Sequence, residues 1–285
     1  MMDKVIFGDN QFFGVNHLSE EKARLQMKKF KDINNIFKVL DYVNDIGIKT
    51  FMVTTYEQVE QICAHVKNNS DQYSGFKINP CLPYAHKYAN AVAAHGIFGT
   101  LKKYLGGNIV SSVSKGGVAL VRKDFEKMME LLVDAELSMF KDVNVEAVFL
   151  QNVVTDLVVG LGMYDFFVAF AEHVRKKYNA KPGFITMNMP QLLDILEERK
   201  IENAVVCASV NKINFRMSGG IEVYKKCLRQ TRQEIIAMQV LAAGAVAPEQ
   251  AVKFIGELGG VNSVLFGAST PKHILDTKNL IEKYV

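Results

Sequence analysis

The sequence has few of the residues that build metal or disulfide sites. Its 285 residues include four cysteines, six histidines and no tryptophan. The cysteines are far apart and none belongs to a CxxC pair; they are Cys63, Cys81, Cys207 and Cys227. This spacing predicts reduced, mostly buried thiols. No histidine pair has the HxxxH spacing with a neighbouring acid that zinc enzymes use, so no metal site is predicted.

Long apolar runs are also missing. No stretch approaches the ~18 apolar residues that a membrane span needs, and the first residues, MMDKVIFGDNQ, lack the apolar segment of a signal peptide. The net charge of +4 comes from scattered lysine pairs, whereas nucleic-acid binding needs a basic face with aromatic residues. We therefore expect a cytoplasmic protein with a small-molecule substrate and with neither nucleic acid nor membrane as partner. The oligomeric state stays open.

Short apolar runs rich in β-branched residues alternate with longer amphipathic segments. Several runs are apolar on both faces, as strands between a barrel interior and an outer ring of helices must be. The eight predicted strands are Lys4–Phe7, Lys49–Val53, Phe76–Ile78, Ala147–Leu150, Phe184–Thr186, Ala204–Cys207, Ile235–Met238 and Ser263–Phe266.

This alternation implies parallel strands with right-handed connections, in either an open doubly wound sheet or a closed barrel. Eight regular units favour closure, and the turn Gly8–Gln11 after the first strand carries no GxGxxG fingerprint. The length is close to the ~250 residues typical of one such barrel. We predict an α/β fold, a single (β/α)8 barrel of the TIM type over residues 1–285.

The connection between the third and fourth strands is too long for a plain barrel unit. It includes the glycine- and serine-rich segment Gly106–Gly117. We predict an insertion over residues 84–123, which is either a lid over the site or a surface insertion.

Polar residues follow nearly every predicted strand, at the face where such barrels carry their active sites. Burying so many polar groups without partners would cost on the order of 1–3 kcal/mol each, so we expect them to bind a small polar substrate. The predicted substrate-binding residues are Asp9, Asn10, Gln11, Gln151, Asn188, Asn211 and Arg216. His17 follows the first strand and is predicted to be catalytic, because histidine exchanges protons near neutral pH.

Two small-residue turns in the last two units open into helices. Exposed backbone N–H groups at such a turn form a ready anion site, commonly for phosphate. The predicted cofactor- or phosphate-binding residues are Gly244, Gly267, Ser269, Thr270 and Lys272. The alternative for Thr270 is that it caps the helix beginning at Pro271.

These turns resemble those of the aldo-keto reductase family. Ile235–Gly244 is similar to its seventh-strand segment, and Val264–Ile274 is similar to its eighth, with the loop that grips the NADPH phosphate. The resemblance implies NADPH as cofactor and carbonyl reduction by an Asp, Tyr, Lys and His tetrad. Tyr56 matches the proton-donating tyrosine, and Lys77 matches the lysine that lowers its pKa.

Two tetrad positions depart from the family pattern. No acid stands in Phe51–Thr55, where the resemblance places the aspartate, and Gln151 and Asn152 stand where it places the histidine. Asn152 could still orient a carbonyl by hydrogen bonding. The sequence alone therefore assigns no cofactor.

Three functions remain open. The first is acid/base chemistry of the lyase or isomerase kind on a small polar, hydroxylated or phosphorylated metabolite, with Tyr56, Lys77, His17 and Asn152 as the catalytic residues. The second is NADPH-dependent reduction. The third is a ligand-binding barrel without catalysis.

Overall fold

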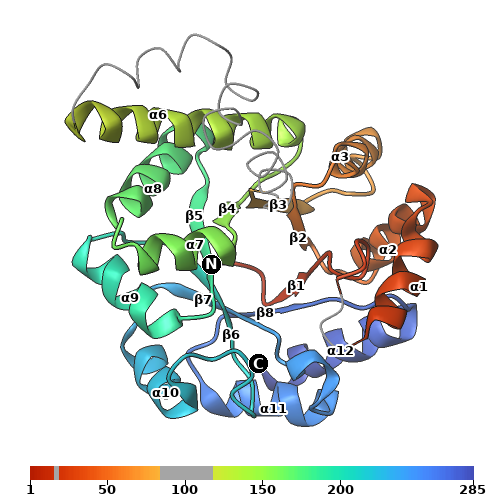
Figure 1. The fold of residues 1–285 in the computed structure, drawn as a ribbon. Helices are drawn as coiled ribbons and strands as arrows, with labels where there is room; N and C mark the ends of the chain where they lie inside the picture. Colours follow the sequence, from red (N-terminus) through yellow and green to blue (C-terminus); the bar gives the residue numbers. More distant parts are fainter. Residues whose placement is uncertain (16–18, 84–117) are drawn as a thin grey trace.

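Eight parallel strands form a closed barrel with helices around it (Figure 1). The computed structural model describes residues 1–15, 19–83 and 118–285. The strands pair in chain order, and β1 pairs with β8 to close the barrel. They are β1 Val5–Phe7, β2 Thr50–Thr54, β3 Lys77–Leu82, β4 Ala147–Leu150, β5 Lys181–Thr186, β6 Val205–Ser209, β7 Glu234–Met238 and β8 Ser263–Phe266. The predicted (β/α)8 barrel is confirmed, with all eight strands in place.

The strands are apolar on both faces because each face has its own packing partner. Inside the barrel, Met52, Phe149 and Ile236 belong to one buried cluster. Outside, Phe51 and Phe184 belong to a second cluster, which the strands share with the surrounding helices. Sequence periodicity of 2 is therefore weak in this sheet, as expected for strands buried on both sides.

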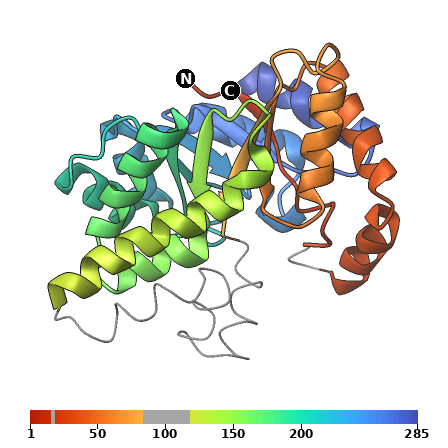
Figure 2. The same cartoon turned by 90° about the horizontal axis from the view of Figure 1, so that it is seen from above.

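The helices cover the barrel along its length (Figure 2). In the described residues they are α1 Glu20–Phe30, α2 Ile33–Asp45, α3 Val59–Asn68, α6 Val118–Leu137, α7 Asn152–Gly160, α8 Asp165–Tyr178, α9 Met189–Glu198, α10 Gly220–Gln230, α11 Pro248–Leu258 and α12 Pro271–Tyr284, with short 3-10 turns at Ser138–Phe140 and Ala242–Gly244. Prolines stand in the first turn of α9, α11 and α12, where their missing N–H costs no helical hydrogen bond.

The third strand is longer than predicted, and this moves its carboxyl end. β3 continues past Ile78 to Leu82. Asn79 allows the strand to continue. Its fully buried side chain accepts hydrogen bonds through Oδ1 from the N–H groups of Glu146 and Ala147, at 3.0 and 3.1 Å. These bonds attach β3 to the start of β4 just before Pro80, which has no N–H to donate.

The predicted insertion, residues 84–123, lies partly within the described residues. Residues 118–123 belong to helix α6, which runs beside α8 on the outside of the barrel (Figure 2). Residues 84–117, including the segment Gly106–Gly117 for which a lid was considered, lie outside the described residues.

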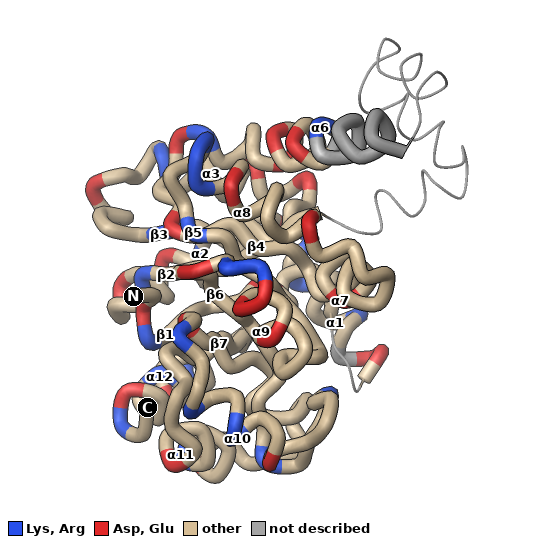
Figure 3. Tube along the Cα trace, turned by 90° about the vertical axis from the view of Figure 1, so that its left-hand side faces the viewer, with Lys and Arg blue, Asp and Glu red and all other residues tan. Residues whose placement is uncertain are grey.

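Charged residues of both signs are interspersed over the outer helices (Figure 3). All four cysteines are free, and all but Cys227 are buried, as the sequence predicts. Among the helices of the described residues, none combines the length and the apolar character needed to cross a membrane.

Candidate active site

The carboxyl ends of β1, β2 and β4 bring three polar side chains together. Asp9 follows β1, and its Oδ2 accepts a 2.8 Å hydrogen bond from the N–H of Thr54, the last residue of β2. Gln151 follows β4, and its Nε2 donates to the Thr54 hydroxyl at 3.0 Å. We call Asp9, Thr54 and Gln151 the mouth cluster. It lies at the face where barrels of this type carry their catalytic residues.

Burial raises the pKa of Asp9, the one ionisable residue of the mouth cluster. The Asp9 side chain is almost inaccessible, at 8% exposure. Desolvation raises the pKa of its carboxyl from the ordinary 3.8 to about 6, and hydrogen bonds from the Thr54 backbone, from its own N–H and from the Thr54 hydroxyl oppose that rise. A carboxyl group that titrates near neutral pH can both give and take a proton under physiological conditions.

Gln11 lies beside the mouth cluster and is almost fully buried. Its Nε2 donates to the carbonyl of Gly8 at 2.6 Å, and among the described residues its Oε1 has no hydrogen-bond partner. Gly267, after β8, is the neighbour of this oxygen: a methyl group added there would stand 2.1 Å from Gln11 Oε1. Only glycine therefore fits at position 267 while Gln11 keeps this conformation.

On the opposite side of the mouth, the polar side chains after β5 and β6 are hydrogen-bonded to neighbouring side chains. Ser209, at the end of β6, donates to Gln239 Oε1 at 2.7 Å, and Asn188 donates through Nδ2 to Gln191 Oε1 at the same distance. The predicted role of Asn188 in substrate binding would require its amide to leave Gln191.

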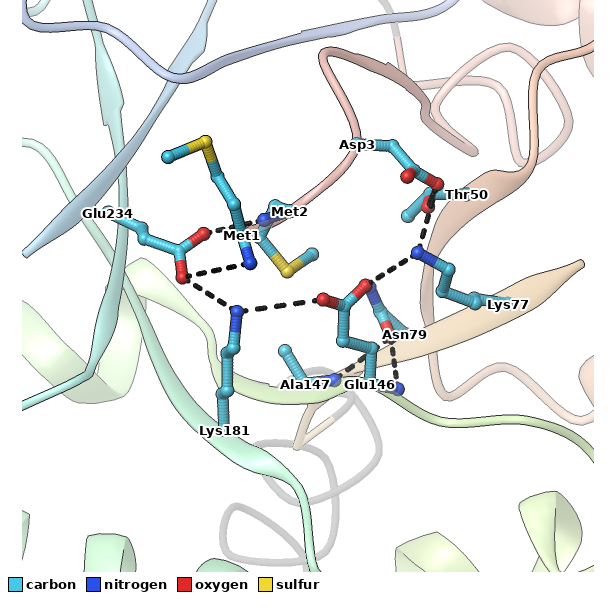
Figure 4. Close-up of polar contacts among 10 residues, drawn as sticks. All are labelled: Met1, Met2, Asp3, Thr50, Lys77, Asn79, Glu146, Ala147, Lys181 and Glu234. Carbon is cyan, nitrogen blue, oxygen red and sulfur yellow. Dashed lines mark hydrogen bonds and ion pairs between the residues drawn. The ribbon is translucent and has the colours of Figure 1, made fainter. Parts of the chain in front are cut away.

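The structure contradicts the predicted pairing of Lys77 with Tyr56. Lys77 is the first residue of β3, so it lies at the amino end of the barrel, opposite the mouth. Its Nζ is 2.9 Å from Glu146 Oε2 and 3.1 Å from Asp3 Oδ2 (Figure 4). The assignment failed because the third strand was expected to end near Lys77, whereas it begins there.

Lys77 belongs to a network of charges that closes the amino end of the barrel. Lys181, the first residue of β5, lies 3.6 Å from Glu146 and 2.6 Å from Glu234, the first residue of β7 (Figure 4). The carboxylates raise the pKa of Lys77 against the effect of burial, which lowers it. Positive and negative charges alternate here, so the network neutralises itself.

Tyr56 keeps a position near the mouth. It lies two residues after the end of β2, and its ring stacks on Phe13, with centroids 3.9 Å apart and planes at 25°. Its N–H donates to the Thr54 carbonyl at 2.7 Å. The role of Tyr56 as proton donor stays a prediction.

Asn211 has a structural role in the loop after β6. It is fully buried, and its side-chain amide both donates to the carbonyl and accepts from the N–H of Phe215, at 2.8 Å each. Both ends of the amide are thus hydrogen-bonded within the loop, and substrate binding by Asn211 stays a prediction. Arg216 and Asn10 are exposed and Asn152 is partly exposed, while His17 lies outside the described residues.

The turn between β8 and α12 has two lysines beside it and a helix N-cap. The Thr270 hydroxyl accepts from the N–H of His273 at 3.4 Å, which is the capping alternative considered for this residue. Lys29 of α1 donates through Nζ to the Ser269 carbonyl at 2.8 Å, and the side chain of Lys272 is 80% exposed while pairing with Asp276. Two lysines therefore lie beside the N-terminus of α12, and phosphate binding at this turn stays a prediction. At the β7 turn, Gly244 is exposed and faces open space.

Three groups of the aldo-keto reductase tetrad are absent from their expected places in the described residues. No acid stands in Phe51–Thr55, β3 ends in Cys81 and Leu82 instead of a lysine, and Gln151 follows β4 in place of a histidine. Burial raises the pKa of the Cys81 thiol well above its ordinary value, and the charge of Asp9 adds to this, so Cys81 stays protonated.

Thr54 and Cys81 were not among the predicted site residues. Both are the inward-facing residues nearest the mouth on their strands, two positions beyond Met52 and Asn79 respectively. Alternation along β2 therefore contained the signal for Thr54. For Cys81 the signal was hidden, because the strand was expected to end before it.

Comparison with solved structures identifies the fold. A Pseudomonas aeruginosa protein assigned as an aldo-keto reductase is similar over 99% of this chain and 91% of its own, with a TM-score of 0.62 and 13% identity. A thermostable aldo-keto reductase, solved with the inhibitor epalrestat, is similar over 99% and 90%, with a TM-score of 0.56 and 10% identity. An aldo-keto reductase from a deep-sea metagenome of the Medee basin covers 87% and 80%, with a TM-score of 0.55 and 10% identity.

No family model matches the chain, and no curated protein matches it in sequence. The chain thus shares the closed-barrel fold of these solved structures, at 10–13% sequence identity.

Proposed function

We propose that this protein is an oxidoreductase of the aldo-keto reductase type, which reduces a small polar carbonyl compound with a nicotinamide nucleotide. The observation that carries the proposal is the similarity of the whole barrel, over 99% of the chain, to enzymes of that kind. The polar mouth cluster stands at the face where those barrels bind their ligands. When bound, the nucleotide would supply the hydride.

The chain's own residues divide into two groups in this proposal. Lys29, Ser269 and Lys272 would hold the phosphate end of the nucleotide, through two ammonium groups and the N-terminus of α12. The mouth cluster and Gln11 would hold the reacting end. The unpartnered Gln11 Oε1 is an acceptor that an amide N–H of a ligand could satisfy.

Titration with NADPH tests the proposal, with nicotinamide fluorescence as the readout. The chain has no tryptophan, so no indole emission overlaps this signal. We expect saturable binding in the wild-type protein and roughly tenfold weaker binding in Lys272→Ala, since one charge-assisted contact is worth about 1.5 kcal/mol. Lys253→Ala is the matched control, because Lys253 also forms an exposed i, i+4 ion pair but stands on α11. Absence of binding by the wild-type protein would end the proposal.

A second candidate is acid/base chemistry without hydride transfer. It is favoured by the absence of lysine and histidine at the described ends of β3 and β4, together with the near-neutral pKa of Asp9. The same titration separates the two candidates, because an enzyme of this kind has no need of NADPH.

A further inference from the structure

We propose that Asp9 is the proton-donating catalytic residue of the barrel mouth, with Thr54 and Gln151 as its positioning residues. This inference rests on the proposed reductase function. It assigns proton transfer to the end of β1, whereas the family tetrad draws its groups from other strands.

The directions of the hydrogen bonds support this assignment. Gln151 Nε2 can only donate, so the Thr54 hydroxyl accepts at 3.0 Å. That hydroxyl then has its own proton free, and its proximity lowers the pKa of the Asp9 carboxyl, whose Oδ2 accepts the Thr54 N–H at 2.8 Å. The carboxyl is therefore positioned by one residue of β2, and the side chain of that residue is in turn hydrogen-bonded by Gln151 after β4.

The surroundings of Asp9 contain no countercharge among the residues that the structure describes. Thr54 faces it from β2 and the Cys81 thiol lies near it from β3, and no described lysine, arginine or histidine pairs with it. A structural carboxylate at 8% exposure would be expected to have a cationic partner. An unpaired buried carboxyl at the mouth of a barrel is instead the environment in which enzymes keep a general acid.

The proposed step balances as follows. In the reducing direction, the O–H bond of protonated Asp9 breaks and a new O–H bond forms on the substrate's carbonyl oxygen. The carbonyl carbon takes up a hydride, for which a reduced nicotinamide nucleotide is the reductant. Asp9 is left as a carboxylate, stabilised by the Thr54 N–H and hydroxyl, and it regains a proton from water. In the oxidising direction, the carboxylate removes the proton of the alcohol.

The test compares Asp9→Asn with the wild-type protein. Asparagine has the same shape and keeps one oxygen to accept the Thr54 N–H, so the variant is expected to fold. With NADPH and para-nitrobenzaldehyde as probes, we expect kcat to fall at least about 100-fold with little change in the affinity for NADPH. Asp156→Asn is the matched control, because Asp156 also accepts from a threonine hydroxyl, that of Thr186, and from a backbone N–H, and should keep its activity.

A second readout does not depend on activity. In protein labelled at the aspartate carboxyl carbons, NMR should show one resonance that is absent from Asp9→Asn and titrates near neutral pH. Thr54→Val should raise that midpoint further, because the hydroxyl that stabilises the carboxylate is lost.

The outcomes are distinct. If the wild-type protein binds NADPH and reduces the aldehyde while Asp9→Asn is equally active, or if the Asp9 resonance titrates near pH 4, the inference is overturned and the proposed function survives. If the wild-type protein neither binds nor oxidises NADPH, the proposed function fails, and the inference fails with it.

Discussion

Replacing Asp9 by asparagine should make the protein more stable, and increasingly so as the pH rises. The carboxyl has a pKa of about 6 in the folded protein against an ordinary 3.8, so the folded state binds its proton more tightly than the unfolded chain does. Between these two values the unfolded state loses the proton first. The contribution of Asp9 to the free energy of unfolding therefore falls as the pH rises through this range.

The magnitude follows from the two pKa values. A difference of about 2 pH units at 1.36 kcal/mol each amounts to about 3 kcal/mol, which is fully lost by about pH 7. Below about pH 3 both states are protonated and the stabilising preference for the protonated carboxyl is fully present. Asparagine does not titrate, so the stability of Asp9→Asn should not change through this window on account of position 9.

Thermal unfolding at pH 4 and pH 7 measures this effect. We expect the Tm of Asp9→Asn relative to wild type to rise by several degrees between the two pH values, since 1 kcal/mol corresponds to roughly 2–4 °C in a chain of this size. Asp142→Asn is the control, because Asp142 is exposed, pairs with Lys67, and has a lowered pKa. A Tm difference for Asp9→Asn that stays constant with pH would refute the reasoning.

Three further predictions concern other parts of the barrel. Lys77→Met should lower the free energy of unfolding by about 1–3 kcal/mol without changing NADPH binding, because it leaves the partly buried carboxylates of Asp3 and Glu146 without their cation at the amino end of the barrel. Lys67→Met breaks only an exposed ion pair and should leave the Tm unchanged. Loss of nucleotide binding in Lys77→Met would contradict the placement of Lys77 away from the mouth. Gly183→Ala should lower the free energy of unfolding, measured by chemical denaturation, by about 1–3 kcal/mol, because the new methyl group would stand 2.3 Å from the fully buried ring of Phe149. Gly160→Ala, in open space at the end of α7, should be neutral or stabilising. Equal stabilities of the two variants would contradict the tight packing of the barrel interior. Thr270→Ala should lower the free energy of unfolding by about 1 kcal/mol through loss of the α12 cap, and an unchanged value would mean that its hydroxyl does not cap the helix.

The barrel could be predicted from the sequence because its signals repeat eight times. Each apolar run and each helix start is weak alone, but regular alternation permits few topologies. The end of one strand was not predictable in the same way. Asn79 and Pro80 usually end a strand, and here a buried Asn79 side chain bonds to β4 and carries the strand on. That shift moved Lys77 from the expected mouth to the opposite end.

The candidate site shows the same limit. Asp9, Gln11 and Gln151 were predicted as site residues because they follow strands, which is a local property of the sequence. The hydrogen bonds of Asp9 and Gln151 to Thr54, and the loss of water around Asp9, depend on strands far apart in the chain. Asn211 shows the converse, because a polar residue after a strand proved to be bonded within its own loop.

Hydride transfer is the central claim, and isotope tracing tests it most directly. The protein is incubated with para-nitrobenzaldehyde and NADPH that carries deuterium at the nicotinamide carbon which donates the hydride, and the alcohol product is analysed by mass spectrometry. We expect an alcohol with one deuterium on the former carbonyl carbon, formed by the wild-type protein and lost with Asp9→Asn. No alcohol, or an alcohol without deuterium when both nicotinamide positions are labelled, would contradict it.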